Sequence, residues 1–177
     1  NLQEQWVSVM KTAGMDDLFK AHNENSVVDN AINWMLRSSR NPSSVLSSVS
    51  QARSNARLVR TALTAIVWAA INRAFIDIKQ KLSRRVSERN LPEVLELISD
   101  RIRSINGAIE GTMLRNEIFN FMRLGTFIER ADSTARIIDV RYYVLLPSLN
   151  AVGSSLDNVQ WDIILRSISA KGGFRME

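Results

Sequence analysis

Residues 123–141 read RLGTFIERADSTARIIDVR, and the spacing of the apolar residues in and around this stretch decides the fold class. When these residues are placed on a helix at about 100° per residue, one arc of the helix is apolar. The arc consists of Phe121, Leu124, Phe127, Ile128, Ala131, Ala135, Ile138 and Tyr142. Other apolar residues, among them Ile118, Phe119 and Ile137, fall on the remaining sides. Apolar residues on almost every side predict a helix that is buried within a bundle of other helices.

The same helix carries many charges on the two sides of its apolar arc. A charge that is buried without a partner is costly, so a buried helix of this kind needs internal partners for its charges. An earlier row of arginines, Arg53, Arg57 and Arg60, has the spacing i, i+4 and i+7. The charges of the helix and of this early arginine row predict a polar pocket or a structural network in the core. The candidate residues are Arg53, Arg57, Arg60, Arg123, Glu129, Arg130, Asp132, Arg136 and Asp139.

Two interpretations of the early arginine row are open. The row could clamp an anionic ligand, since guanidinium groups bind phosphate and carboxylate through paired hydrogen bonds. It could instead pair with the acids of the 123–141 helix, which is the interpretation we favour. Residues 30–76 contain no Asp or Glu, so any acidic partner within the protein must come from outside that segment.

Carboxylate chemistry is the competing hypothesis for the same helix. A paired-carboxylate or metal site could be built from Glu110, Glu117, Glu129, Asp132 and Asp139. Bundles that hold two metal ions usually use Glu-x-x-His pairs, and the only histidine is His22. The chain also has no cysteine, no glycine-rich phosphate loop and no nucleophile elbow. We therefore expect neither a metal nor a cofactor, and no autonomous enzyme.

Helical spacing continues outward from this segment in both directions. The pattern predicts helices over residues 2–13, 27–37, 91 to about 111, 117 to about 146, and 157 to about 168. Residues 43–82 form either one long helix or two helices, the second starting at Thr64. No segment alternates with period two for long enough to predict a strand. The chain of 177 residues is therefore expected to be a single all-α domain, an antiparallel bundle of about six helices.

Composition agrees with this fold and limits the location of the protein. Only 3 Pro and 7 Gly are present, too few for the many turns of a sandwich or barrel. No apolar run is long enough to span a membrane, and no signal peptide is recognised at Asn1. We expect a cytoplasmic protein without a membrane partner. The net charge of +5 does not indicate nucleic-acid binding, because the basic run at 83–89 lacks aromatic residues on which bases could stack.

Two motifs resemble one known family. The first covers Arg123, Leu124-Gly125, residues 127–132, residues 134–136 and Asp139-Val140, with Glu129-Arg130 at its centre. The second covers residues 40–44, 52–53, 55–57 and 59–60. Both resemble the bacterial alpha-E domain family, an all-helical domain named for a Glu-Arg motif. Members of that family usually carry an earlier copy of the motif near the N-terminus, and this sequence is expected to begin after that copy.

The resemblance implies a role without implying a reaction. Alpha-E domains look like companions of ATP-grasp-type amide ligases and of transglutaminase-like peptidases. We therefore expect a non-catalytic accessory or scaffold domain with a protein partner, an ATP-grasp-type ligase by resemblance. The alternative is an enzyme or ligand-binding domain that uses a carboxylate and arginine pocket around Glu129. A homo-oligomer is also expected, because a missing motif helix would leave apolar residues such as Ile118, Phe119 and Ile137 to be covered.

Overall fold

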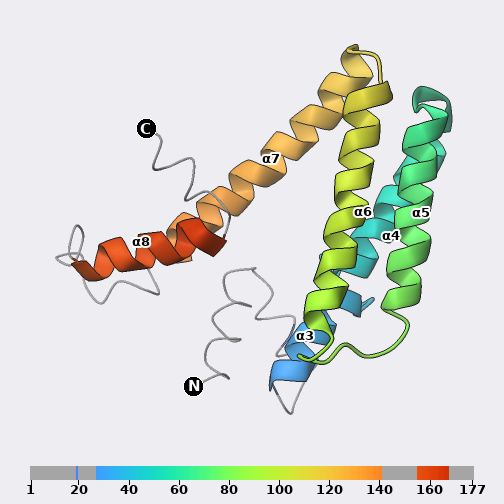
Figure 1. Cartoon of the computed structure of the whole chain (residues 1–177). Coiled ribbons are helices and arrows are strands. Elements are labelled where there is room, and N and C mark those ends of the chain that lie inside the picture. The colour runs from blue at the N-terminus through green and yellow to red at the C-terminus, as the bar shows by residue number, and fades with distance from the viewer. Residues whose placement is uncertain (1–18, 20–26, 141–154, 168–177) are drawn as a thin grey trace. The chain divides into compact units, whose positions relative to one another are not determined.

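The computed structural model describes residue 19, residues 27–140 and residues 155–167. The chain divides into two compact units, residues 1–127 and 128–177, and each is described by itself. All the regular structure in the described residues is helical, which confirms the predicted all-α class. The helices between residues 27 and 112 pack against one another as a bundle (Figure 1). The predicted helix at 2–13 and His22 lie outside the described residues.

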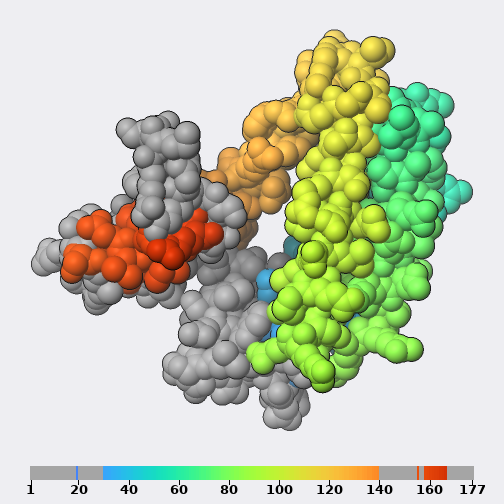
Figure 2. All heavy atoms as spheres, viewed as in Figure 1, coloured from blue at the N-terminus to red at the C-terminus, as the bar shows by residue number. Residues whose placement is uncertain are grey.

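In its described residues, the first unit contains four α-helices and the start of a fifth. Helix α3 spans Val27–Arg37, α4 spans Val45–Leu58, α5 spans Ala65–Lys81 and α6 spans Leu91–Thr112. Helix α7 begins at Glu117 and runs to Val140. Helices α4, α5 and α6 lie side by side, and α5 packs against both of its neighbours (Figure 1). The side chains of α5 and α6 meet along much of the length of both helices (Figure 2).

The structure answers the question about residues 43–82, which form two helices. Helix α4 ends at Leu58, and a short 3₁₀ turn, Arg60–Ala62, separates it from α5. Thr64 restarts the chain as the N-cap of α5, because its Oγ1 accepts a hydrogen bond of 3.2 Å from the backbone N–H of Val67. The same hydroxyl lies 2.7 Å from Oγ1 of Thr112, which joins the start of α5 to the end of α6.

Two larger hydrophobic cores and a small cluster of Phe19, Ala31 and Trp34 lie among the described residues of the first unit. The first core joins α3, α4, α5 and α6 with the loop between α5 and α6, and contains Ile32, Leu36, Val49, Ile78, Leu82, Val86 and Val94. The second core joins α4, α5, α6 and the start of α7, and contains Ala56, Val67, Ile71, Ala108, Met113 and Phe119. Val86 is 2% exposed although its neighbours in sequence are polar, so the loop at 83–90 is anchored in the first core.

Helix α7 is much less buried than its sequence pattern predicted. Its first turn is anchored by Phe119, which is 6% exposed and belongs to the second core rather than to an uncovered face. From Leu124 onward, its described side chains are exposed or half-buried, so the prediction of a buried helix is wrong. A helical wheel shows which residues share a side of a helix. It does not show which sides the rest of the protein covers, and the pattern therefore cannot fix burial.

In the second unit, the structure describes the remainder of α7 and helix α8, Ser155–Ser167. Helix α8 begins at Ser155, two residues before the predicted start at residue 157. Among the described helices, none is long and apolar enough to cross a membrane.

Candidate functional site

The predicted site residues of α7 lie at the surface. Glu129, Arg130, Asp132, Arg136 and Asp139 are all exposed. Glu129 accepts a hydrogen bond of 2.9 Å from the hydroxyl of Ser133, one turn further along the same helix. Glu129, Asp132, Arg136 and Asp139 therefore do not form the expected buried network in the part of the chain that the structure describes. Exposed charges keep their hydration and need no internal partner, which removes the reason for expecting one.

One ion pair of this group forms within α7 itself. Nε of Arg136 lies 2.8 Å from Oδ2 of Asp132, an i, i+4 pair whose side chains are about half-exposed. The hydrogen bond and charge of Asp132 raise the pKa of Arg136 above its ordinary value. Pairs of this kind support a helix slightly and are screened by salt. The pair stabilises the helix locally and does not form a reaction centre.

The early arginine row packs against α5. The guanidinium of Arg53 lies 4.7 Å from the ring centre of Phe75, and its Nε donates a 2.7 Å hydrogen bond to Oδ1 of Asn72. The guanidinium of Arg60 lies 5.4 Å from the ring centre of Trp68. Cation–π contacts of this kind, rather than ion pairs, hold these two side chains.

The pairing that we favoured for this row is not seen in the described contacts. In the described part of the chain, none of its three arginines forms an ion pair with an acid of α7. Arg57 is exposed on α4, while Arg53 and Arg60 lie against aromatic rings of α5. The described contacts of Arg53 and Arg60 are therefore with aromatic and neutral groups of α5 and the turn before it.

Glu110, near the end of α6, is the acid that brings basic side chains together. Its Oε1 lies 2.7 Å from a guanidinium nitrogen of Arg123 on α7, and its Oε2 lies 2.8 Å from one of Arg115. The guanidinium of Arg115 is also 4.1 Å from the ring centre of Phe119, and that of Arg123 is 4.8 Å from the ring centre of Phe127. Arg123 is thus a predicted site residue that pairs with an acid of another helix.

The pH dependence of stability should reveal this cluster. The hydrogen bond from Arg115 and the charges of Arg115 and Arg123 hold the pKa of Glu110 below its ordinary value of 4.5. A lowered pKa means that the folded state prefers the ionised carboxylate. The stabilisation should therefore be complete above about pH 4.5 and should disappear as the pH falls through the lowered pKa.

Urea unfolding of the wild type and of Glu110→Gln at a series of pH values measures this contribution. We expect a small difference in unfolding free energy near neutral pH, because both arginines are largely exposed, and we expect it to shrink towards zero in acid. If the difference in unfolding free energy between the two proteins grew as the pH falls, Glu110 would not be stabilised by its two arginines.

The carboxylates do not gather into a metal site in the described part of the chain. In those residues no three His, Asp or Glu side chains lie close enough together to hold a metal ion. The site that sequence reasoning missed lies at the junction of α3 and α4, where Arg37, Arg40 and Arg85 line one cavity. The signal was present in part, since Arg37 and Arg40 belong to the acid-free segment 30–76. Arg85 comes from a distant loop, and no spacing rule connects it to the other two.

The fold and these contacts define an all-helical domain whose most charged helix is solvent-exposed. A comparison with protein-family models matches residues 1–177 to Alpha-E, "a predicted alpha-helical domain with a conserved ER motif". The chain therefore belongs to the Alpha-E family, as its motifs predicted. No curated protein and no solved structure matches the chain. The description of the family names no function.

Proposed function

We propose that this chain is a non-catalytic accessory domain that binds a protein partner through helix α7. The observation that carries the proposal is the exposure of three apolar residues on one side of that helix. Phe121 is 70% exposed, Leu124 is 51% exposed and Phe127 is 50% exposed. We call these three residues the α7 apolar face. A contiguous apolar surface of this kind usually marks an interaction site.

The composition of the α7 apolar face fits protein binding. Aromatic residues and arginine are enriched at the centres of protein interfaces. Two of the three residues are phenylalanines, and Arg123 lies over the ring of Phe127. Glu110 holds Arg123 from α6, so the ring and the guanidinium are positioned before a partner arrives. A preorganised surface loses less conformational freedom on binding, which favours affinity.

The alternative, an enzyme or ligand-binding domain with a pocket around Glu129, has less support. Glu129 is exposed, and its described hydrogen bond is to Ser133 of the same helix. Electrostatic catalysis depends on charges held in a site from which water is excluded. Charges in contact with water act weakly on one another and on a substrate, because the surrounding dielectric is high. The exposed charges of α7 are better suited to the rim of an interface.

We assign the partner to the ATP-grasp-type amide ligases, on the strength of the family resemblance. The expectation is that the ligase carries the reaction and that this chain binds it without catalysing a step of its own. The test uses the purified ligase, with ATP-dependent ligation measured in the presence and absence of this chain. Ligation should depend on the ligase, change when the chain is added, and be absent with the chain alone.

Calorimetric titration of the ligase with two variants of α7 tests the binding surface. Phe121→Asp places a charge in the apolar face and should weaken binding by at least about tenfold, the effect typical of an interface anchor. Thr126→Asp introduces the same charge on the opposite side of the helix and should leave the affinity within about twofold. Equal weakening by both variants, or no binding of the wild type, would contradict the proposal.

A second copy of the chain is the competing occupant of the α7 apolar face. Sedimentation of the wild type and of Phe121→Asp distinguishes the two. We expect any self-association to be weaker than binding to the ligase. A stable dimer that Phe121→Asp dissociates, with no complex formed by the ligase, would assign the face to a homo-oligomer instead.

A further inference from the structure

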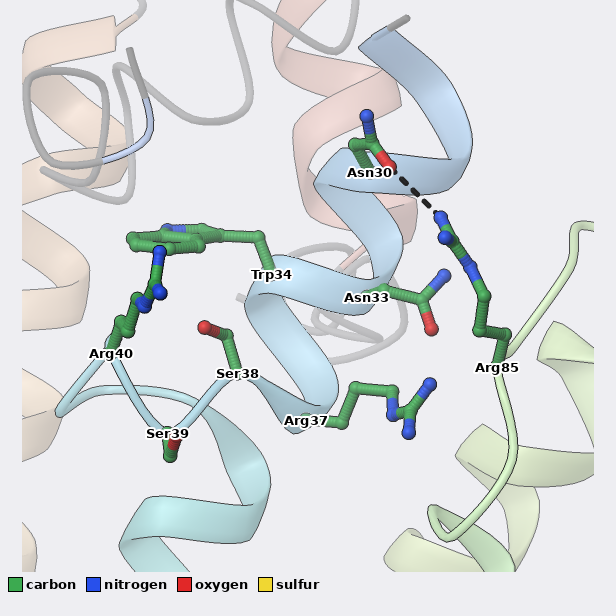
Figure 3. A pocket seen from close by; sticks show the side chains of 8 residues that line it. All are labelled: Asn30, Asn33, Trp34, Arg37, Ser38, Ser39, Arg40 and Arg85. Atoms are coloured by element: carbon green, nitrogen blue, oxygen red, sulfur yellow. Dashed lines mark hydrogen bonds between the residues drawn. The ribbon is translucent and has the colours of Figure 1, made fainter. Parts of the chain in front are cut away.

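The strongest unassigned feature of the first unit is a cavity of about 390 Å³ at the junction of α3 and α4. Arg37 comes from the last turn of α3, Arg40 from the turn that follows it, and Arg85 from the loop between α5 and α6. Figure 3 shows Arg37 and Arg85 on one side of the cavity and Arg40 beneath the ring of Trp34. The described lining contains these three arginines together with Trp34, asparagines and serines, and it contains no carboxylate.

The arginines of this cavity are held by neutral groups. Arg85 donates a 2.8 Å hydrogen bond to Oδ1 of Asn30, the contact drawn in Figure 3. Arg37 donates a 3.2 Å hydrogen bond to the backbone oxygen of Ser83. Within the described residues, neither of them forms a salt bridge, nor does Arg40. Positive charges that share a cavity without acids repel one another, and an anion between them relieves that repulsion.

The loop that supplies Arg85 is fixed to α3. The side-chain amide of Asn33 donates a 2.8 Å hydrogen bond to the backbone oxygen of Val86. The backbone N–H of Val86 donates a 2.9 Å hydrogen bond to Oδ1 of the same asparagine. Because Val86 is also buried in the first core, Arg85 leaves the backbone from a fixed point beside the cavity. The basic lining is therefore preorganised rather than assembled by the ligand.

The turn that carries Arg40 is equally constrained. Nδ2 of Asn41 donates a 3.2 Å hydrogen bond to the backbone oxygen of Trp34, and Oδ1 accepts one of 3.0 Å from the N–H of Ser43. The hydroxyl of Ser44 donates a 2.8 Å hydrogen bond to the backbone oxygen of Ser38 and caps α4. Asn41 is 1% exposed and Ser44 is 0% exposed. This buried polar turn fixes the backbone on either side of Arg40.

We propose that this cavity binds the phosphate group of a small phosphorylated molecule. Guanidinium groups form paired hydrogen bonds with phosphate oxygens, and a phosphate dianion gains more than a carboxylate from three positive charges. The cavity has the size of the smaller ligand sites in proteins, which typically begin near about 300 Å³. That size favours a small molecule over a polymer. The inference does not depend on the α7 apolar face.

Titration of the full chain followed by ¹H–¹⁵N NMR tests the site. The probes are glycerol phosphate, inorganic phosphate and acetate, each at low ionic strength. We expect saturable shifts at residues 37–40 and 83–86 with both phosphate probes, and binding of acetate that is weaker by about tenfold. Tighter binding of glycerol phosphate than of inorganic phosphate would identify the ester, and the reverse order would identify free phosphate.

Two matched variants decide whether the effect belongs to the cavity. Arg40→Gln and Arg57→Gln each remove one exposed arginine, the first at the cavity and the second on α4. Arg40→Gln should weaken phosphate binding by about tenfold, and Arg57→Gln should leave it unchanged. Binding to the wild type should also weaken when ionic strength rises from about 50 mM to about 300 mM. Equal weakening by both variants, equal binding of acetate, or no saturable shift would overturn the assignment.

Discussion

Replacing Ile78 with alanine should lower the free energy of unfolding by about 2–5 kcal/mol. Ile78 is 1% exposed, and its side chain lies in the core where α3, α4, α5 and α6 meet. Its removal takes away buried methyl groups and leaves a cavity that the surrounding helices can fill only in part. Urea unfolding followed by circular dichroism measures the loss.

Ile76→Ala provides the matched control for this experiment. Ile76 belongs to the same helix and is chemically identical, but it is 47% exposed. Its replacement should cost about 1 kcal/mol or less, because less apolar surface returns to water and no enclosed cavity forms. A similar loss of unfolding free energy in the two variants would show that α5 does not face the core with the side that carries Ile78.

Replacing Asn41 with alanine should lower the free energy of unfolding by about 1–3 kcal/mol. The variant removes the donor to the backbone oxygen of Trp34 and the acceptor for the N–H of Ser43. The carbonyl of Trp34 belongs to the last turn of α3, where the carbonyl groups have no partners within the helix. A buried polar group that loses its partner accounts for the expected cost.

Asn55→Ala is the control for Asn41→Ala, with the same change of side chain. Asn55 is exposed on α4, and its Oδ1 accepts a hydrogen bond from the exposed side chain of Gln51. Its loss should change stability by about 0.5 kcal/mol or less, because water replaces the lost partner. Urea unfolding of both variants compares them directly. An Asn41→Ala variant as stable as Asn55→Ala would contradict the structural role given to the turn at 40–44.

Local signals in the sequence predicted much of the helical framework. The start of α5 could be predicted because a threonine that caps a helix acts on the residues immediately after it, and Thr64 does so. The predicted start of α6 at residue 91 is confirmed, and Pro92 and Glu93 are residues that suit the first turn of a helix. The residues that start a helix lie within a few positions of its first turn, so the start of a helix can be predicted from a single sequence.

Burial and side-chain partners could not be predicted in the same way. The wheel placed Phe119 among apolar residues left to be covered, yet it packs in the second core. Phe121, Leu124 and Phe127 belong to the arc that was expected to face the core, and all three are exposed. Which side of a helix is covered depends on the docking of the other helices, and a helical period contains no information about that docking.

The contacts of the arginines depend on register between helices that are separate in sequence. Arg53 lies over Phe75, 22 positions further along the chain, and Arg40 shares a cavity with Arg85. Contacts at such separations follow from the way in which α5 folds back between α4 and α6. A hydrophobic pattern predicts that helices pack, but it does not give the register at which they meet.

The most direct test of the central claim, that the α7 apolar face binds the ligase, is a footprint with single cysteines. The chain has no cysteine, so Leu124→Cys and Thr126→Cys each introduce one thiol, on opposite sides of the exposed helix. The measurement is the rate of maleimide labelling of each variant with and without saturating ligase. The account predicts that the ligase slows labelling of Leu124→Cys by at least about tenfold, since a buried interface excludes the reagent, and leaves Thr126→Cys within about twofold. Equal labelling rates at Leu124→Cys in the presence and absence of bound ligase would contradict it.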